Sequence, residues 1–123
     1  MTKEECIRLY FDSWLKQDNC AWDMLFSEDV DYSECYGPCY HSLSMLKKWF
    51  AQWNQFGKVL EWEIQGFIQA GNQMSVSWYF HTIYEGEEDA FDGVSIVSFD
   101  ETGKMKSVKE YQSTLPHVTI CLK

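Results

Sequence analysis

The side chains that could do chemistry in this sequence are a carboxylate and a set of indole rings. Glu110 lies in a predicted strand over residues 105–112, whose two-residue period turns it toward the interior. A buried carboxylate needs a partner, so we expect Glu110 either to pair with Ser95, Tyr10 or a bound water, or to act as an acid in its own right. The indoles lie on the inward faces of the predicted helices and strands: Trp14, Trp49, Trp53, Trp62 and Trp78.

These aromatic residues have two interpretations. Any single tryptophan is explained well enough as ordinary core. Six tryptophans and 17% aromatic residues, however, are more than a small interior usually needs. We therefore expect some of them to line a pocket and stack on a planar ligand, together with Phe80, Phe91, Ser95 and Glu110.

The cysteines and histidines give no comparable signal. Five cysteines is an odd number, and the opening residues lack the apolar stretch of a signal peptide, so we expect reduced thiols. Cys35, Cys39 and His41 are close in sequence, but zinc sites usually add a second ligand pair, and none follows. His81 and His117 are interpreted as surface residues. We predict no metal and no organic cofactor.

Helices precede strands in the predicted order of elements. Thr2 and Glu5 form a capping box, and apolar residues at helical spacing extend a helix over 2–17. Further helices are expected over 21–26 and 42–53. Short alternating segments then predict strands near 30–32, 60–65, 75–82, 91–99 and 105–112, with Leu60, Trp62 and Ile64 on one buried face. Helices gathered on one face of an antiparallel sheet make an α+β fold.

Length and charge set the broad class. A chain of 123 residues suits one domain over residues 1–123. A formal net charge of −9 argues against binding to nucleic acid, and no basic cluster or long apolar run indicates a membrane. We expect a soluble, cytoplasmic protein.

Three segments carry a resemblance to a known superfamily. Residues 25–32, LFSEDVDY, resemble the element after the second helix of nuclear-transport-factor-2-like (NTF2-like) proteins. Residues 99–105, FDETGKM, resemble their hairpin, and residues 109–111, KEY, resemble their closing strand. The resemblance covers nearly the whole chain and implies a cone-shaped, cystatin-like fold. In that fold three N-terminal helices pack on a curved antiparallel sheet, and the cone can enclose a pocket for a small, mostly apolar molecule.

Within this superfamily the chain is most similar to ketosteroid isomerases and SnoaL-like polyketide cyclases. An ungapped alignment of the first helices puts Tyr10 at the oxyanion-binding tyrosine and Glu34 at the general base. Ser95 stands where the isomerases have a protonated aspartate. The resemblance implies cofactor-free proton transfer of the isomerase, cyclase or dehydratase type, in which Glu34 moves the proton. Polycyclic aromatic molecules are the substrates of the cyclases.

The alternative is a module without catalysis, which binds an apolar ligand or another protein. An enzyme needs a desolvated acid that faces a hydrogen-bond donor, whereas aromatic walls are enough for a binder. Val94 and Ile96 have outward parity on their strand. Exposed apolar strand faces tend to be interfaces, and we therefore expect a homodimer through the convex face of the sheet.

Overall fold

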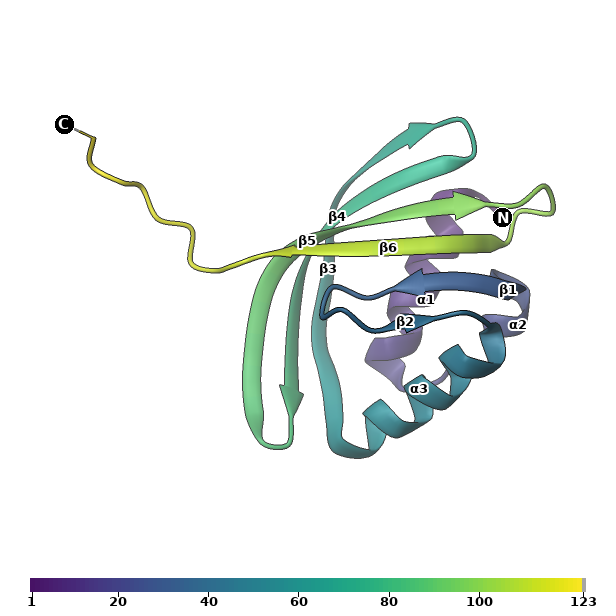
Figure 1. The fold of residues 1–123 in the computed structure, drawn as a ribbon, viewed down its shortest axis with the longest axis horizontal. Coiled ribbons are helices and arrows are strands. Elements are labelled where there is room, and N and C mark those ends of the chain that lie inside the picture. Colours follow the sequence, from purple (N-terminus) through teal and green to yellow (C-terminus); the bar gives the residue numbers. More distant parts are fainter. Residues whose placement is uncertain (123) are drawn as a thin grey trace.

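Three helices and six strands make up the computed structural model, which describes residues 1–122 (Figure 1). The helices are α1 (Lys3–Lys16), α2 (Trp22–Leu25) and α3 (Leu43–Phe56). The strands are β1 (Phe26–Ser33), β2 (Cys39–Tyr40), β3 (Gly57–Ala70), β4 (Gln73–Tyr84), β5 (Glu87–Phe99) and β6 (Met105–Ser113). The predicted α+β fold is confirmed.

All six strands belong to one curved sheet in the order β2-β1-β6-β5-β4-β3. The long strands β3, β4 and β5 bend along their length, so the sheet wraps around the helical layer (Figure 1). The pairs are antiparallel except that β1 runs parallel to β6. This parallel pair was not expected, and it follows from the chain order, because β1 joins the sheet beside its last strand.

The helices cover the concave face of the sheet. Thr2 caps α1 by accepting a hydrogen bond from the backbone N–H of Glu5 at 3.1 Å, as the capping box predicts. Helix α1 packs against β3, while α3 packs against β1 and β3. The buried face of α1 then places Tyr10, Phe11 and Trp14 in the interior.

Several predicted boundaries need correction. The second helix ends at Leu25, and Phe26 already begins β1, which is an eight-residue strand rather than a short one. Helix α3 continues past Trp53 to Phe56. In β3 the register shifts between Val59 and Glu61, so Val59 is buried and Leu60 is 36% exposed. A bulge of this kind adds one residue and turns the neighbouring side chain to the other face.

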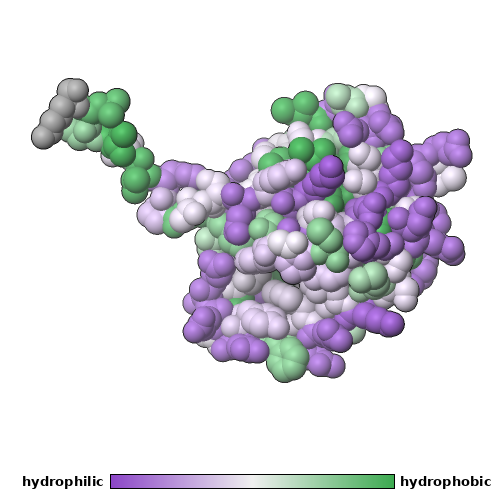
Figure 2. All heavy atoms as spheres, viewed as in Figure 1, coloured by the Kyte–Doolittle hydropathy of each residue, from purple (hydrophilic) through white to green (hydrophobic). Residues whose placement is uncertain are grey.

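The C-terminal segment after β6 leaves the body of the molecule (Figure 1). Its apolar side chains are exposed, as Figure 2 shows: Val118, Ile120 and Leu122. None of the helices in residues 1–122 combines the length and the apolarity that a membrane crossing needs.

Candidate functional site

A cavity of about 50 Å³ lies between the helices and the sheet. A buried water needs at least about 10–15 Å³ of space, so the cavity is large enough to hold water or a compact ligand. Five of the six tryptophans line it: Trp14, Trp49, Trp53, Trp62 and Trp78. Val59 and Phe80 complete the apolar wall, while Glu34 and Glu110 add two carboxyl groups. Its size suits a compact molecule rather than a flat polycyclic one.

The indoles are arranged as walls at steep angles to one another. Trp14 meets Trp53 at 90°, with 5.5 Å between ring centroids, and Trp62 meets Trp78 at 89° and 5.8 Å. Edge-to-face contacts of this kind are favourable between aromatic rings. Gly93 of β5 lies opposite Trp78 of β4, and a Cβ atom at that position would overlap the indole ring. A glycine is therefore what allows the Trp78 ring to lie flat over the sheet.

Glu110 is the acidic group deepest in the cavity. Strand β6 pairs it directly with Ser95 of β5, and the Ser95 hydroxyl donates a hydrogen bond to its carboxylate at 3.1 Å. Ser95 accepts a hydrogen bond in turn from Trp78 Nε1 at 2.9 Å. Burial raises the pKa of Glu110 to about 7, although the facing hydroxyls of Tyr32 and Ser95 lower it, and the charge of Glu34 raises it further. The group is therefore poised to gain or lose a proton at neutral pH.

Two tyrosines extend this polar chain: Tyr32, which lines the cavity, and Tyr10 behind it. Tyr32 lies opposite Val108 in the parallel β1–β6 pair, so it shares a sheet face with Glu110 two residues further on. The Tyr10 hydroxyl donates a hydrogen bond to the Tyr32 hydroxyl at 2.6 Å. Both tyrosines are almost fully buried, and burial raises the pKa of each. Protonated tyrosines can hold and orient a carboxylate without competing for its charge.

Glu34 lies in the loop after β1 and is half-buried. Its carboxylate accepts a hydrogen bond from the Tyr40 hydroxyl at 2.9 Å. Burial raises the pKa of Glu34, while the bond from Tyr40 lowers it. The exposed Tyr36 follows two residues later and also lines the cavity. Glu34 therefore belongs to the solvent side of the site and Glu110 to its interior.

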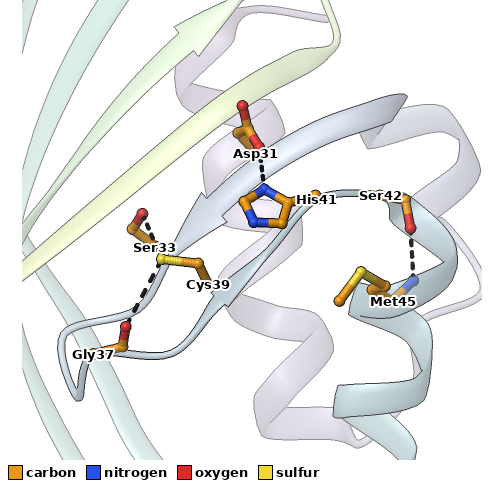
Figure 3. Close-up of polar contacts among 7 residues, drawn as sticks. All are labelled: Asp31, Ser33, Gly37, Cys39, His41, Ser42 and Met45. Carbon is orange, nitrogen blue, oxygen red and sulfur yellow. Dashed lines mark hydrogen bonds and ion pairs between the residues drawn. The ribbon is translucent and has the colours of Figure 1, made fainter.

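Local contacts hold the β1–β2 turn that carries Glu34 (Figure 3). The Ser33 hydroxyl lies 3.4 Å from the Cys39 sulfur, and the Cys39 thiol donates to the Gly37 carbonyl at 3.8 Å. His41 Nδ1 lies 2.7 Å from an Asp31 carboxylate oxygen. Because both ends of the turn are tied to strand residues, its position over the cavity is fixed by the fold.

The structure brings most of the predicted site residues to one place. Glu34, Glu110, Phe80 and all five predicted tryptophans line the cavity. Three others lie behind this lining. Tyr10 contacts Tyr32, Ser95 contacts Glu110, and Phe91 packs its ring against Trp78 at 5.9 Å. Tyr10 and Glu34 make their side-chain hydrogen bonds to different partners, Tyr32 and Tyr40.

Sequence reasoning missed four lining residues: Tyr32, Cys35, Tyr36 and Val59. Alternation along β1 could have revealed Tyr32, since Val30 and Tyr32 are both fully buried. Val59 could not be found by alternation, because the bulge in β3 reverses the expected face. Tyr36 and Cys35 lie in a turn, where no periodic pattern exists.

The cysteines and histidines do not form a metal site. All five cysteines, which lie within residues 1–122, are free thiols. The same part of the chain contains no group of three or more His, Cys, Asp or Glu side chains suited to a metal ion. His41, His81 and His117 instead lie beside carboxylates, of Asp31, of Glu61 with Glu88, and of Asp92.

The fold and the lined cavity define a protein of the NTF2-like, ketosteroid-isomerase-like class. The chain belongs to the SnoaL-like domain family, whose sequence pattern matches residues 7–108. The superfamily and the cone-shaped fold predicted from the sequence are thereby confirmed. No curated protein is similar enough to count as a match.

Solved structures agree on the fold. A candidate SnoaL-like polyketide cyclase from Mesorhizobium loti is 21% identical, covers 90% of this chain and 99% of its own, and superposes with a TM-score of 0.71. A protein of ketosteroid-isomerase-like fold from Catenulispora acidiphila, in complex with trimethylamine, is 17% identical, with coverages of 89% and 86% and a TM-score of 0.78. An NTF2-like protein from Burkholderia pseudomallei is 13% identical, with coverages of 92% and 92% and a TM-score of 0.77.

Proposed function

We propose that this protein binds a small, mostly apolar molecule in the tryptophan-lined cavity and moves a proton on it without a cofactor. The observation that carries the proposal is the Glu110 carboxyl group in the wall of an apolar cavity, hydrogen-bonded to Ser95, where burial raises its pKa to about 7. A general acid or base works best when its pKa lies near the working pH. Glu110 therefore takes the proton-transfer role that the isomerase alignment gave to Glu34.

The surrounding hydroxyls support this assignment. Ser95 and Tyr32 both face the Glu110 carboxylate, and Tyr10 donates to Tyr32 behind it. This series of hydroxyl groups keeps the Glu110 carboxylate oriented while the carboxylate exchanges its proton. Tyr10 is a positioning residue here, since it does not line the cavity and acts through Tyr32. We assign to Glu34, which lies at the solvent side, the exchange of protons with water.

Deuterium exchange tests the proposal without a known substrate. Small ketones, such as acetone and cyclopentanone, are incubated with the protein in D₂O at pD near 7, and loss of the α-proton signal is followed by NMR. We expect exchange above the buffer rate, and a loss of at least about 100-fold in the enzymatic rate for Glu110→Gln. Glutamine can still accept the bond from Ser95, so the variant should keep its fold.

Glu34→Gln is the matched control for the role of Glu110. It removes the other lining carboxylate, and we expect only a partial loss of rate. Exchange that survives intact in Glu110→Gln, or that disappears only in Glu34→Gln, would return the base role to Glu34. No exchange on any ketone of this size would end the proton-transfer part of the proposal.

A pocket for binding alone is the second candidate function. The small volume of the cavity and its nearly complete aromatic lining favour it, because a binder needs no reactive group. In this case ligands stabilise the folded state by mass action and are released unchanged. A ligand that raises the melting temperature of wild type and of Glu110→Gln equally would favour the binding function.

The convex face of the sheet supports the proposal of a homodimer. Val94 of β5 lies opposite Tyr111 of β6, and the Tyr111 ring is 54% exposed. Ile96 follows on the same face and is 38% exposed. Light scattering at micromolar concentration should give twice the chain mass, and Ile96→Asp should reduce it to one chain. A monomeric mass for wild type would exclude this dimer.

A further inference from the structure

We propose that the ligand of this cavity is a small organic cation, of the size of a tetramethylammonium group, held by indole faces and by the carboxylates of Glu34 and Glu110. The inference rests on the pocket of the proposed function but not on its proton-transfer step. It follows from three properties of the lining: its charge, its ring arrangement and its volume.

The charge of the lining has one sign. Glu34 and Glu110 contribute carboxyl groups, and among residues 1–122 no Lys, Arg or His side chain lines the cavity. An anion would therefore meet two carboxylates and no counter-charge, which disfavours it strongly in an apolar site. A cation would favour the ionised form of both acids and would offset the charge of Glu34, which raises the pKa of Glu110.

The rings form the kind of enclosure that holds an alkylated ammonium. Tryptophan is the best partner of a cation among the aromatic side chains, and several rings around one ammonium group make an aromatic cage. Trp14 stands at 90° to Trp53 and at 61° to Trp49, and all three line the cavity, so the wall contains indole rings in different orientations. Trp62 and Trp78 close the sheet side at 89° to each other.

One polar detail distinguishes this cavity from ordinary core. The indole N–H groups of Trp14 and Trp62 are buried and have no hydrogen-bond partner among the described residues. Trp22, the one tryptophan outside the lining, donates its N–H to Ser13 Oγ at 2.9 Å. These two N–H groups lie beside the cavity and can report on its occupation, although an alkylated ammonium has no lone pair with which to accept a bond from them.

The volume sets the size of the cation. A cavity of about 50 Å³ favours a compact occupant with few non-hydrogen atoms. Tetramethylammonium has five such atoms, as does tert-butanol, which is similar in shape and neutral. These two molecules differ mainly in charge, and their comparison therefore isolates the electrostatic part of binding.

The test is calorimetric titration of the whole chain with tetramethylammonium chloride and with tert-butanol at pH 8. Sodium chloride at physiological concentration screens the exposed acidic surface. We expect the cation to bind at least about tenfold more tightly than the alcohol. Affinity for the cation should fall as the pH is lowered to 5, because burial raises the pKa of Glu110 to about 7 and this carboxylate gains a proton over that range. Tyr32, Cys35 and Tyr36, the titratable lining groups other than the two carboxyl groups, stay neutral over this range.

Two variants and one spectrum complete the design. Glu110→Gln should lower the affinity for the cation about tenfold and leave the affinity for the alcohol unchanged. Trp53→Leu should have the same effect, because it removes a π face but keeps the apolar contact. In a ¹⁵N-correlated spectrum the indole N–H signals of Trp14 and Trp62 should shift on binding, while that of Trp22 stays. Equal affinity for both molecules would overturn the cation proposal and leave the pocket in place. Binding of neither would overturn both the pocket and this inference.

Discussion

The interior of this protein has a filled half and a hollow half, built from the same kinds of residue. In the filled half Tyr10, Trp22 and Phe26 pack at 5.0–5.5 Å between centroids, and each is at most 2% exposed. In the hollow half Trp49 and Trp53 are only partly buried and border the cavity. Aromatic content alone therefore does not decide whether an interior closes.

What separates the halves is how their polar atoms are satisfied. The filled half is complete in itself, since Trp22 donates to Ser13 and Tyr10 donates to Tyr32. The hollow half keeps two unpartnered indole N–H groups and a carboxyl group whose pKa burial raises to about 7. Polar groups in an apolar interior cost free energy unless they are paired. Their presence on one side agrees with our proposal that this side binds a ligand.

Truncating one tryptophan in each half should give the largest contrast. Trp22→Ala leaves a void in a fully packed region and should lower the free energy of unfolding by about 3–5 kcal/mol. Trp53→Ala enlarges a space that already exists, and we expect a cost of about 1 kcal/mol. Denaturant titration of both variants measures the difference. Similar costs for the two would mean that the cavity wall is core like the rest.

The pH dependence of stability should differ between wild type and Glu110→Gln. The pKa of Glu110 is raised in the folded state, so the proton binds more tightly there than in the unfolded chain. The contribution of Glu110 to the free energy of unfolding should then be fully present below the unfolded pKa and should be lost as the pH rises from about 4.5 to about 7, by at most about 3 kcal/mol. Glu110→Gln should remove that part of the slope. Denaturant titrations at several pH values measure this dependence. If the free energy of unfolding depends on pH in the same way for wild type and Glu110→Gln, Glu110 ionises as it does in the unfolded chain.

Tyr32→Phe should have a smaller effect, on the stability of the filled half and on the pKa of Glu110 in the hollow half. The substitution removes the acceptor of the Tyr10 hydroxyl and one of the two hydroxyls that face Glu110. We expect a loss of about 1 kcal/mol in stability and a further rise in the pKa of Glu110, because the hydroxyl favours the ionised carboxylate. Tyr40→Phe, which removes the partner of Glu34, is the control and should leave the pKa of Glu110 nearly unchanged. An unaltered pKa in Tyr32→Phe would uncouple the tyrosine pair from the acid.

Much of the fold was predictable because periodicity reports which face of an element is buried. The predicted face of α1 is buried as expected at Tyr10, Phe11 and Trp14. Periodicity gave the wrong face for Leu60, because a bulge breaks the two-residue period there. It also placed Phe26 in a helix, because the strand follows the helix without a spacer. Local patterns carry no information about such shifts, since these depend on the strand that pairs alongside.

The site was predictable in its residues more than in their roles. Inward parity identified Glu110, and the tryptophans were found by their spacing. Which carboxylate is the more desolvated depends on neighbours far away in sequence, such as Tyr32 and Ser95 for Glu110. Whether indoles fill a cone or line it depends on side-chain rotamers, which the sequence does not specify.

The most direct test of a desolvated, reactive carboxyl group in the cavity is a ¹³C NMR titration of the glutamate side chains. The Glu110 signal is assigned by its absence from the spectrum of Glu110→Gln. We predict that the titration of Glu110 has its midpoint near pH 7, well above that of an exposed glutamate. We also predict that tetramethylammonium lowers this midpoint, because a bound cation favours the ionised carboxylate. A midpoint near 4.5 would contradict the account, since Glu110 would then be an ordinary solvated acid and the cavity would lack its reactive group.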